Sequence, residues 1–401
     1  MTLSERQLVT DVGKALGTDY FLIRTELSDA ELDYLDRTRR FVDEELTPVI
    51  GDYWQREELP LDLCRRLGAL GLVGDGLQGY GIPDMSPIAS GLIHMELHRG
   101  DGSVGTALGV QAGLAMRSIA MLGSEEQKLE WLPQMATMEK LGAFALTEPD
   151  HGSDSVALET IAVRDGGDWV ITGRKRWIGF GTVADVVVVW ARDVDDAQVK
   201  GFLVETPADG YNATVMEGKG SLRAMWNADI VLDGLRVPES NRLPLATSFR
   251  ETAKVLKATR QVCAWAALGH AVAAYDAALS YCRARKQFGK PLVSFQMVQQ
   301  QLVDMLGEVT AMQLFCLRIG RLMESDQLSD TIAAMAKRNN TIKARAVCAQ
   351  ARNLLGGNGL LHDYHVIRHM NDIEAIYTYE GTEAIQTLIV GRDITGVSAF
   401  V

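Results

Sequence analysis

The segment "YTYEGTEAIQTLIVGRDITG" near the C-terminus contains an acid whose position suits base chemistry. Glu380 stands between Tyr379 and Gly381, and the apolar residues after Thr382 recur at helical spacing. The dipole of a helix stabilises a carboxylate near its start, so an ordinary surface acid is one interpretation. The other interpretation is a general base aimed into a pocket. The rest of the sequence has to decide between the two.

Two segments farther upstream could hold a flat or phosphorylated ligand. In "AFALTEPDHGSDS", residues 143–155, Gly152 and the short polar side chains predict a tight turn that exposes backbone N–H groups and hydroxyls. Such concavities suit a phosphate or the edge of a flavin, although a capped linker explains the segment equally well. In "GRKRWIGFGT", Trp177 ends a predicted strand. It is either a core residue or the cover of a planar cofactor.

Two further segments join the predicted helices of the C-terminal half. In "RARKQFGKPLVSFQ", Arg285 and Gln296 flank a Gly-Lys-Pro turn, which is either a basic loop or an anion clamp for a pyrophosphate. In "NLLGGNGLLHDYHVIRH", glycines follow a long helical pattern. They form a simple helix cap or permit the close approach of another chain or a ligand.

Two other patterns carry no site. The segment "GDGLQG", residues 74–79, matches G-x-G-x-x-G, but a helical pattern precedes it and Pro83 follows, so we expect a turn. His365 and His369 share a helical face close to His362. No Cys partner and no H-E-x-x-H accompany them, so we expect solvated or salt-bridged histidines and no metal site.

Three kinds of pattern divide the chain. Residues 28 to about 140 have helical periodicity, with Ser28 as an N-cap ahead of Glu31 and Ser124 opening another helix. Segments rich in β-branched and aromatic residues follow, separated by Gly, Pro and Asp, and predict an antiparallel β domain. Three long helical patterns and the shorter one opening at Thr382 then favour an antiparallel four-helix bundle. We place the domains at residues 1–142, 143–245 and 246–401.

The composition limits the function classes. The chain has 401 residues, 47% of them apolar, which is enough for a large composite core. A net charge of −12 without a basic cluster disfavours a nucleic-acid binder. The five scattered cysteines predict reduced thiols in the core. Without a signal sequence or an apolar run of about 20 residues, we expect a soluble, cytoplasmic protein with no membrane span.

In combination, "LTEPDHGSD", "RKQFGKPL", "LLGGNG" and "YEGT" resemble the acyl-CoA dehydrogenase family, in the family's order and over residues 28 to 401. The segments "GKGSLRA", "KRNN", "YHVIRH" and "GRDITG" are most similar to its glutaryl-CoA dehydrogenase branch. The resemblance implies a multi-domain α+β fold with an N-terminal all-α domain, a central β domain and a C-terminal four-helix bundle. It also implies one FAD per subunit, a homotetramer, an acyl-CoA substrate, an electron-transferring flavoprotein as acceptor and a place in β-oxidation.

The resemblance assigns the catalytic base to Glu380. Some branches carry the base at the position of Thr259, just before Arg260, so here no carboxylate competes. Glu380 would remove the α proton while the β hydrogen leaves as hydride to flavin N5, giving a trans-2-enoyl-CoA. The Glu380 N–H and a ribityl hydroxyl would stabilise the enolate oxygen. The helix dipole would keep Glu380 ionised, and an acyl chain that expels water would raise its pKa again.

The same resemblance assigns the binding residues. Arg260 would bind the CoA moiety, with Ser153, Tyr379 and Gly381 also at the substrate. The FAD would contact Phe144, Leu146, Thr147, Ser153, Trp177 and Gly179 in one subunit, Thr382 from the bundle, Asn353 and Gly357 nearby, and Arg285, Phe288, Leu292, Phe295 and Gln296 of a neighbouring subunit.

Two departures from the family pattern leave alternatives open. The family commonly has Trp-Ile-Thr where this chain has Gly179 as the third residue, and a similar plant branch with Trp-Ile-Gly is an acyl-CoA oxidase. The space beside the flavin is then expected to be larger.

The second departure concerns the substrate. Gly105 replaces the Arg that holds the distal carboxylate of glutaryl-CoA, and His98 replaces an acid. Because burying an unpaired carboxylate is costly, we expect an uncharged acyl chain, unless Arg99 compensates. A non-catalytic flavin-binding protein is the third alternative.

Overall fold

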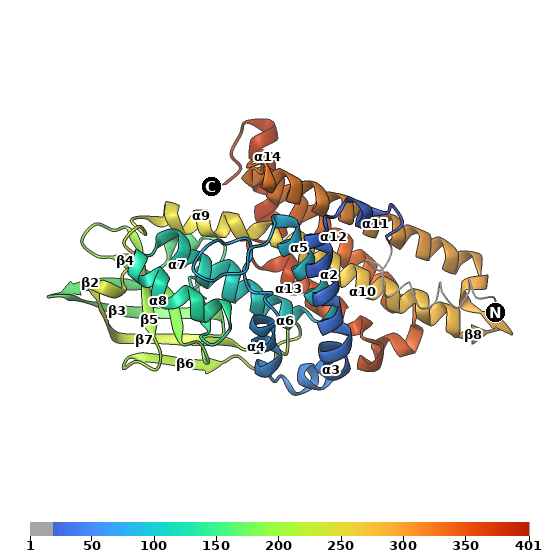
Figure 1. Cartoon of the computed structure of the whole chain (residues 1–401), viewed down its shortest axis with the longest axis horizontal. Coiled ribbons are helices and arrows are strands. Elements are labelled where there is room, and N and C mark those ends of the chain that lie inside the picture. The colour runs from blue at the N-terminus through green and yellow to red at the C-terminus, as the bar shows by residue number, and fades with distance from the viewer. Residues whose placement is uncertain (1–18, 401) are drawn as a thin grey trace.

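The computed structural model describes residues 19–400, in which a β-sheet lies at one end of a long helical body (Figure 1). Both predicted helix starts are confirmed. Ser28 forms a capping box with Glu31, and Ser124 forms one with Gln127. The N-terminal elements are η1 Ile23–Glu26, α2 Asp29–Phe41, the π-helix η2 Val42–Leu46, α3 Thr47–Arg56, α4 Leu61–Ala69, α5 Pro87–Gly100, α6 Gly102–Leu108, the π-helix η3 Gly109–Met116, α7 Arg117–Leu122 and α8 Glu125–Ala136.

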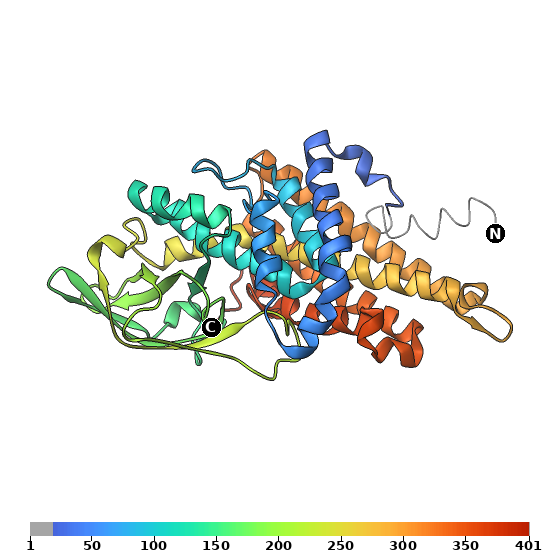
Figure 2. The same ribbon diagram turned by 60° about the horizontal axis from the view of Figure 1, so that its bottom comes forward.

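The central sheet has the strand order β1-β4-β2-β3-β7-β6, with β5 paired to β4. Most neighbouring strands are antiparallel, as expected, but β1 and β2 each run parallel to β4. Figure 2 shows α7 and α8 lying over this sheet. The strands are β1 Gly142–Ala145, β2 Ile161–Asp165, β3 Asp168–Gly179, β4 Val186–Asp193, β5 Val199–Glu205, β6 Tyr211–Val215 and β7 Asn227–Pro238, and the short helices are η4 Ser155–Ala157 and η5 Glu239–Asn241.

The bundle differs from the expectation in its fourth helix. Helix α13 packs against both α10 and α12, whereas α14, which opens at the predicted Thr382, packs mainly on α12. The elements are α9 Phe249–Arg260, α10 Val262–Ala284, the hairpin β8 Lys286–Gln287 and β9 Lys290–Pro291, η6 Leu292–Ser294, α11 Gln296–Glu324, α12 Asp330–Leu354, η7 Gly356–Leu360, η8 His362–Tyr364, α13 Val366–Thr378 and α14 Glu383–Thr395.

Helices α9 and α10 form one continuous rod of 36 residues. By length and hydropathy this rod could cross a bilayer, but 78% of its most apolar stretch is buried inside the protein. That burial is typical of the core helix of a bundle. The five cysteines are buried and free, as the sequence predicted. The G-x-G-x-x-G segment is a turn, also as predicted.

Candidate active site

Glu380 lies in a tight loop between α13 and α14. Its φ is +53° and that of Gly381 is +82°, so both residues adopt the left-handed conformation. This conformation is strained for a residue with a side chain and persists only where the surroundings fix it. The side chain of Gln386 donates to the carbonyls of Glu380 and Gly381 at 3.1 and 2.9 Å. Lys337 on α12 donates to the carbonyls of Tyr379 and Gly381.

The Glu380 carboxylate points toward α9, where it accepts a hydrogen bond of 2.9 Å from the Thr259 hydroxyl. The residue keeps partial exposure, yet burial of its carboxyl group raises the pKa of Glu380 above its usual range. The Lys337 ammonium offsets part of this rise in pKa. The sequence-based expectation was that the helix dipole holds the acid ionised until a substrate expels water. In the structure, the protein itself already supplies the burial that raises the pKa.

The backbone N–H of Glu380 completes the arrangement. Within residues 19–400 it donates to no backbone or side-chain acceptor. The backbone N–H of this half-buried residue is therefore available to the oxygen of a ligand that enters the site. One residue therefore presents a carboxylate base and an available hydrogen-bond donor.

The π-helix η3 lies against both the end of β3 and Thr259, the hydrogen-bond partner of Glu380. A Cβ built on Gly113 would lie 3.4 Å from the Thr259 side chain, which bonds Glu380. One turn earlier, Val110 lies against Gly179, where a Cβ would be 2.9 Å from it. Thr259, which bonds the base, and the strand end therefore border the same short helix. π-Helical turns are frequent at functional sites.

The first two predicted flavin segments lie side by side. The backbone N–H of Arg176 donates to the Thr147 carbonyl at 2.8 Å, and Lys175 donates to the Leu146 carbonyl at 3.1 Å. The adjacent Trp177 has a φ of +66° and remains 54% exposed. An exposed indole held in a strained conformation beside a polar turn fits a planar aromatic ligand.

A buried ion pair that the sequence reasoning missed fixes this turn. Lys175 lies 2.8 Å from Glu148, which also accepts from the backbone N–H groups of Glu159 and Thr160. Removing one partner of such a pair leaves an uncompensated buried charge, so the pair ties residues 146–160 firmly to β3.

Three of the predicted flavin-binding residues, Phe144, Ser153 and Thr382, have different surroundings in the structure. Phe144 is buried with its ring 5.8 Å from that of Trp190, so its side chain belongs to the sheet core. Ser153 is exposed on the turn. The Thr382 hydroxyl caps α14 by accepting from the Ile385 N–H at 3.3 Å. The flavin contacts of these three residues stay predictions.

The hairpin residues lie far from Trp177 within one chain. Figure 1 shows β8 at the opposite end of the molecule from the sheet. Phe288 is 93% exposed there, and Asn353 and Gly357 are exposed at the same end of the bundle. The structure therefore does not bring these residues to the site of their own subunit. Contact with a neighbouring subunit's cofactor stays a prediction for Arg285, Phe288, Leu292, Phe295, Gln296, Asn353 and Gly357.

Arg260 forms an ion pair with Asp330 at the start of α12. Its guanidinium also lowers the pKa of Glu380, though less than Lys337 does. Its role in binding CoA stays a prediction, and any phosphate would share this guanidinium with Asp330.

The prediction of solvated or salt-bridged histidines was wrong for His365 and His369, whereas His362 is half-exposed. His369 is buried, and its Nδ1 lies 2.9 Å from Nδ1 of His270. His365 is partly buried and lies beside Arg368. Burial lowers the pKa of His270, His365 and His369, so these three rings are neutral at pH 7. Among residues 19–400, no cluster of metal-ligating side chains forms.

His98 and Gly105, which both differ from the family pattern, lie next to each other in the structure. A Cβ on Gly105 would lie 2.3 Å from two atoms of the His98 imidazole, too close to be accommodated. The ring is held by a 2.8 Å contact between its Nδ1 and the His94 carbonyl. Burial lowers the pKa of His98 to about 3, so the ring is neutral. The imidazole thus occupies the space in which a side chain at position 105 would begin.

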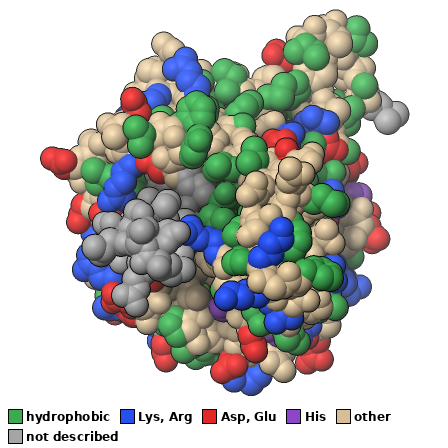
Figure 3. Space-filling model, turned by 90° about the vertical axis from the view of Figure 1, so that its right-hand side faces the viewer, with side chains coloured by type: hydrophobic (Ala, Val, Ile, Leu, Met, Phe, Trp, Pro, Cys, Tyr) green, Lys and Arg blue, Asp and Glu red, His purple; other side chains and the backbone are tan. Residues whose placement is uncertain are grey.

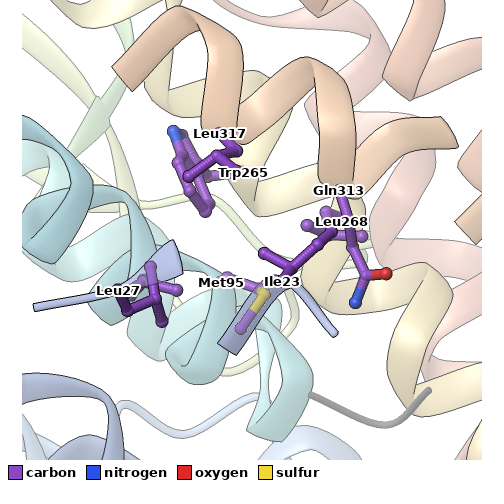
Figure 4. A pocket seen from close by; sticks show the side chains of 8 residues that line it. Ile23, Leu27, Met95, Trp265, Leu268, Gln313 and Leu317 are labelled. Atoms are coloured by element: carbon purple, nitrogen blue, oxygen red, sulfur yellow. The ribbon is translucent and has the colours of Figure 1, made fainter. Parts of the chain in front are cut away.

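A small cavity elsewhere in the molecule is not part of this site. It lies where the segment at Ile23 meets α5, α10 and α11, and its volume is about 10 Å³ (Figure 4). That space holds about one water molecule, and its lining is almost wholly apolar. It is therefore a packing void.

Family models match the chain in three successive parts. The N-terminal domain of acyl-CoA dehydrogenase matches residues 28–139, the middle domain residues 143–235 and the C-terminal domain residues 249–395. The mitochondrial short-chain specific acyl-CoA dehydrogenase of Bos taurus is 33% identical over 88% of this chain and 87% of its own length.

Solved structures agree with these matches. The crystal structure of glutaryl-CoA dehydrogenase from Mycobacterium smegmatis has a TM-score of 0.93 and 42% identity, covering 96% of this chain and 99% of that one. A second glutaryl-CoA dehydrogenase structure from the same organism, in complex with FADH2, has a TM-score of 0.91 and 38% identity over 94% and 97% of the two chains. Together with the site geometry, these likenesses establish that the chain belongs to the acyl-CoA dehydrogenase family.

Proposed function

We propose that this protein is an FAD-dependent acyl-CoA dehydrogenase in which Glu380 removes the α proton of a saturated acyl-CoA thioester, giving a trans-2-enoyl-CoA. The observation that carries the proposal is that one residue combines a carboxylate with a backbone N–H that has no acceptor within residues 19–400. When bound, FAD supplies the acceptor for the β hydride. The exposed Trp177 and the turn at Leu146 and Thr147 are the residues that would hold it.

The chain itself contributes proton transfer and charge stabilisation. The raised pKa of Glu380 makes its carboxylate a stronger base than an exposed acid. The α proton of a thioester is weakly acidic, so negative charge develops on the thioester oxygen as the proton leaves. The Glu380 N–H is a fixed donor for this oxygen. The Thr259 hydroxyl holds the carboxylate on the side of η3.

We propose an electron-transferring flavoprotein as the acceptor, with oxygen as the alternative. The expected extra space at Gly179 is filled, because a Cβ there would lie 2.7 Å from Met225 and 2.9 Å from Val110. This packing favours a dehydrogenase over an oxidase. A panel of acyl-CoA thioesters, first without and then with oxygen, tests the proposal. Reduction of the flavin with little peroxide in air supports it, and rapid peroxide formation contradicts the choice of acceptor.

For the substrate, we propose a simple, uncharged acyl chain. The likeness to glutaryl-CoA dehydrogenase makes glutaryl-CoA the second candidate. However, the position of the family's carboxylate-binding Arg is held by Gly105, and the neutral His98 ring fills the adjoining space. A buried carboxylate without a partner costs several kcal/mol. We therefore expect kcat/KM for butyryl-CoA to exceed that for glutaryl-CoA by about 100-fold or more.

The coupling of positions 98 and 105 gives a sharper test of this preference. Gly105→Arg alone should lower activity toward both thioesters, because its Cβ collides with His98. The double variant His98→Glu with Gly105→Arg replaces the rigid imidazole with a flexible side chain that can rotate away, and it supplies a guanidinium. It should therefore gain activity toward glutaryl-CoA relative to Gly105→Arg. Steady-state kinetics on both thioesters measures this. A wild-type preference for glutaryl-CoA would contradict the assignment.

We also propose that the protein is a homotetramer. Figure 3 views the end of the molecule that carries the bundle and shows hydrophobic side chains on its surface. A groove of about 580 Å³ lies between α11, α12 and α14, with Phe315, Ile332, Met335 and Ile394 in its lining. Large exposed apolar surfaces mark interaction sites. Light scattering of the purified protein tests this, since a monomeric mass would contradict it.

A further inference from the structure

We propose that Lys337 is a positioning residue that strengthens the Glu380 N–H as a hydrogen-bond donor, acting through the peptide group between Tyr379 and Glu380. This inference rests on the proposed function above. Lys337 lies on α12 with a relative exposure of 0%. Its ammonium donates to the carbonyl of Tyr379 and, at 2.6 Å, to that of Gly381. It therefore binds the two carbonyls that flank the base.

The argument follows from the geometry of one peptide group. The carbonyl of Tyr379 and the N–H of Glu380 belong to the same planar, conjugated unit and point in opposite directions. A cation on the carbonyl oxygen withdraws electron density from the unit and makes the N–H a better donor, as in any hydrogen-bonded chain. This N–H has no acceptor among residues 19–400. The charge of Lys337 is thus relayed to the point where the thioester oxygen becomes negative.

The charged and titratable groups around Glu380 single out Lys337. Arg260 reaches Glu380 from α9, but its guanidinium is already paired with Asp330. The Cys263 thiol of α10 is buried and its pKa is raised to about 11, so it is neutral. The Tyr379 phenol has a raised pKa and is neutral as well. In the described part of the chain, the Lys337 ammonium donates to carbonyl oxygens and forms no ion pair with a carboxylate. Burial lowers the pKa of Lys337, and the neighbouring Cys263 and Glu380 offset part of that fall.

The position of Lys337 suits both stages of proton transfer. Before transfer, the negative charge is on the Glu380 carboxylate, and Lys337 lowers its pKa against the effect of burial. After transfer, Glu380 is neutral and the charge is on the thioester oxygen at the Glu380 N–H. The same ammonium stabilises the charge in either place, so moving the proton does not leave a buried cation without a compensating charge.

The test uses the FAD-loaded enzyme and a ligand that ionises without turnover. Acetoacetyl-CoA has an acidic α carbon, and its enolate shares charge with the thioester oxygen and absorbs in the near ultraviolet. Titrating the bound ligand with pH measures how strongly the site stabilises an enolate. The variants are Lys337→Met, which removes charge and donor, and Lys337→Gln, which keeps a neutral donor. Lys343→Met is the control, because Lys343 lies on the same helix in a half-exposed ion pair with Glu308.

We expect both Lys337 variants to raise the pKa of the bound enolate by about one unit or more and to lower kcat by about 10- to 100-fold. The control should match the wild type. An unchanged enolate pKa in Lys337→Met, or in Lys337→Gln if the Met variant does not fold, overturns the inference. A wild-type pKa in Lys337→Gln alone also overturns it, since a neutral donor would then suffice. If no acyl-CoA reduces the wild-type flavin, the proposed function fails instead.

Discussion

Glu380→Gln is expected to retain FAD and to lose turnover by about 1,000-fold or more. The amide has the shape of the carboxylate and still accepts the hydrogen bond from Thr259. The backbone carbonyls that Lys337 and Gln386 hold are unaffected. The variant loses only the ability to accept the α proton. Steady-state kinetics with butyryl-CoA and an artificial electron acceptor measures the loss, and the visible spectrum measures retained flavin.

The pH dependence of the same variant separates base catalysis from positioning. Glu380 must be deprotonated to act, and burial raises its pKa. Wild-type kcat should therefore fall as the pH drops through that raised pKa, and the residual activity of Glu380→Gln should lack this acidic limb. Glu383→Gln is the matched control, since this neighbouring acid pairs with Arg338 at 2.6 Å on the helix surface. Near-normal activity in Glu380→Gln would remove the assigned base.

The second large effect is expected on stability. Arg368 on α13 is 1% exposed and forms an ion pair with Asp101, the N-cap of α6. It also donates to the Gly100 carbonyl at 2.9 Å. Burial raises the pKa of the neighbouring Asp372 to about 7, and the Arg368 guanidinium offsets part of that rise. Arg368→Met leaves the buried Asp101 carboxylate without its cation. We expect destabilisation of about 3–5 kcal/mol and a Tm lower by roughly 4–6 °C in thermal unfolding.

A surface pair provides the comparison for this prediction. Arg345 on α12 lies 2.7 Å from Glu374 on α13, with both side chains 41% or more exposed. Arg345→Met should cost no more than about 1 kcal/mol, because solvent screens the pair. Equal melting temperatures for the Arg345 and Arg368 variants would mean that the buried pair does not hold α13 against the N-terminal domain.

Local rules were sufficient for several parts of the fold. Ser28 and Ser124 cap helices as predicted because a capping box needs only residues three apart. The change from helical to strand periodicity near residue 143 coincides with β1, which begins at Gly142. These features depend on residues that are close together in the sequence, so they can be predicted from the sequence alone.

Features that depend on contacts between distant segments were not predictable. The parallel pairing of β1 with β4 and the packing of α13 between α10 and α12 are decided by which faces meet in three dimensions. The sequence contains one indication that Lys337 is buried, because this lysine falls on the same helix face as the buried Ala333, Ala344 and Thr341. A lysine on an apolar stripe points to a buried partner, but periodicity alone could not identify the carbonyls beside Glu380.

The central claim is that Glu380 and bound FAD act on the two carbons next to a thioester carbonyl. Anaerobic titration of the purified protein with butyryl-CoA, followed by the visible flavin absorbance, tests it most directly. We predict that the wild-type flavin bleaches as substrate is added, whereas the flavin of Glu380→Gln stays oxidised while remaining bound. A wild-type flavin that stays oxidised with every saturated acyl-CoA, or a Glu380→Gln flavin that bleaches as fast as the wild type, would contradict the account.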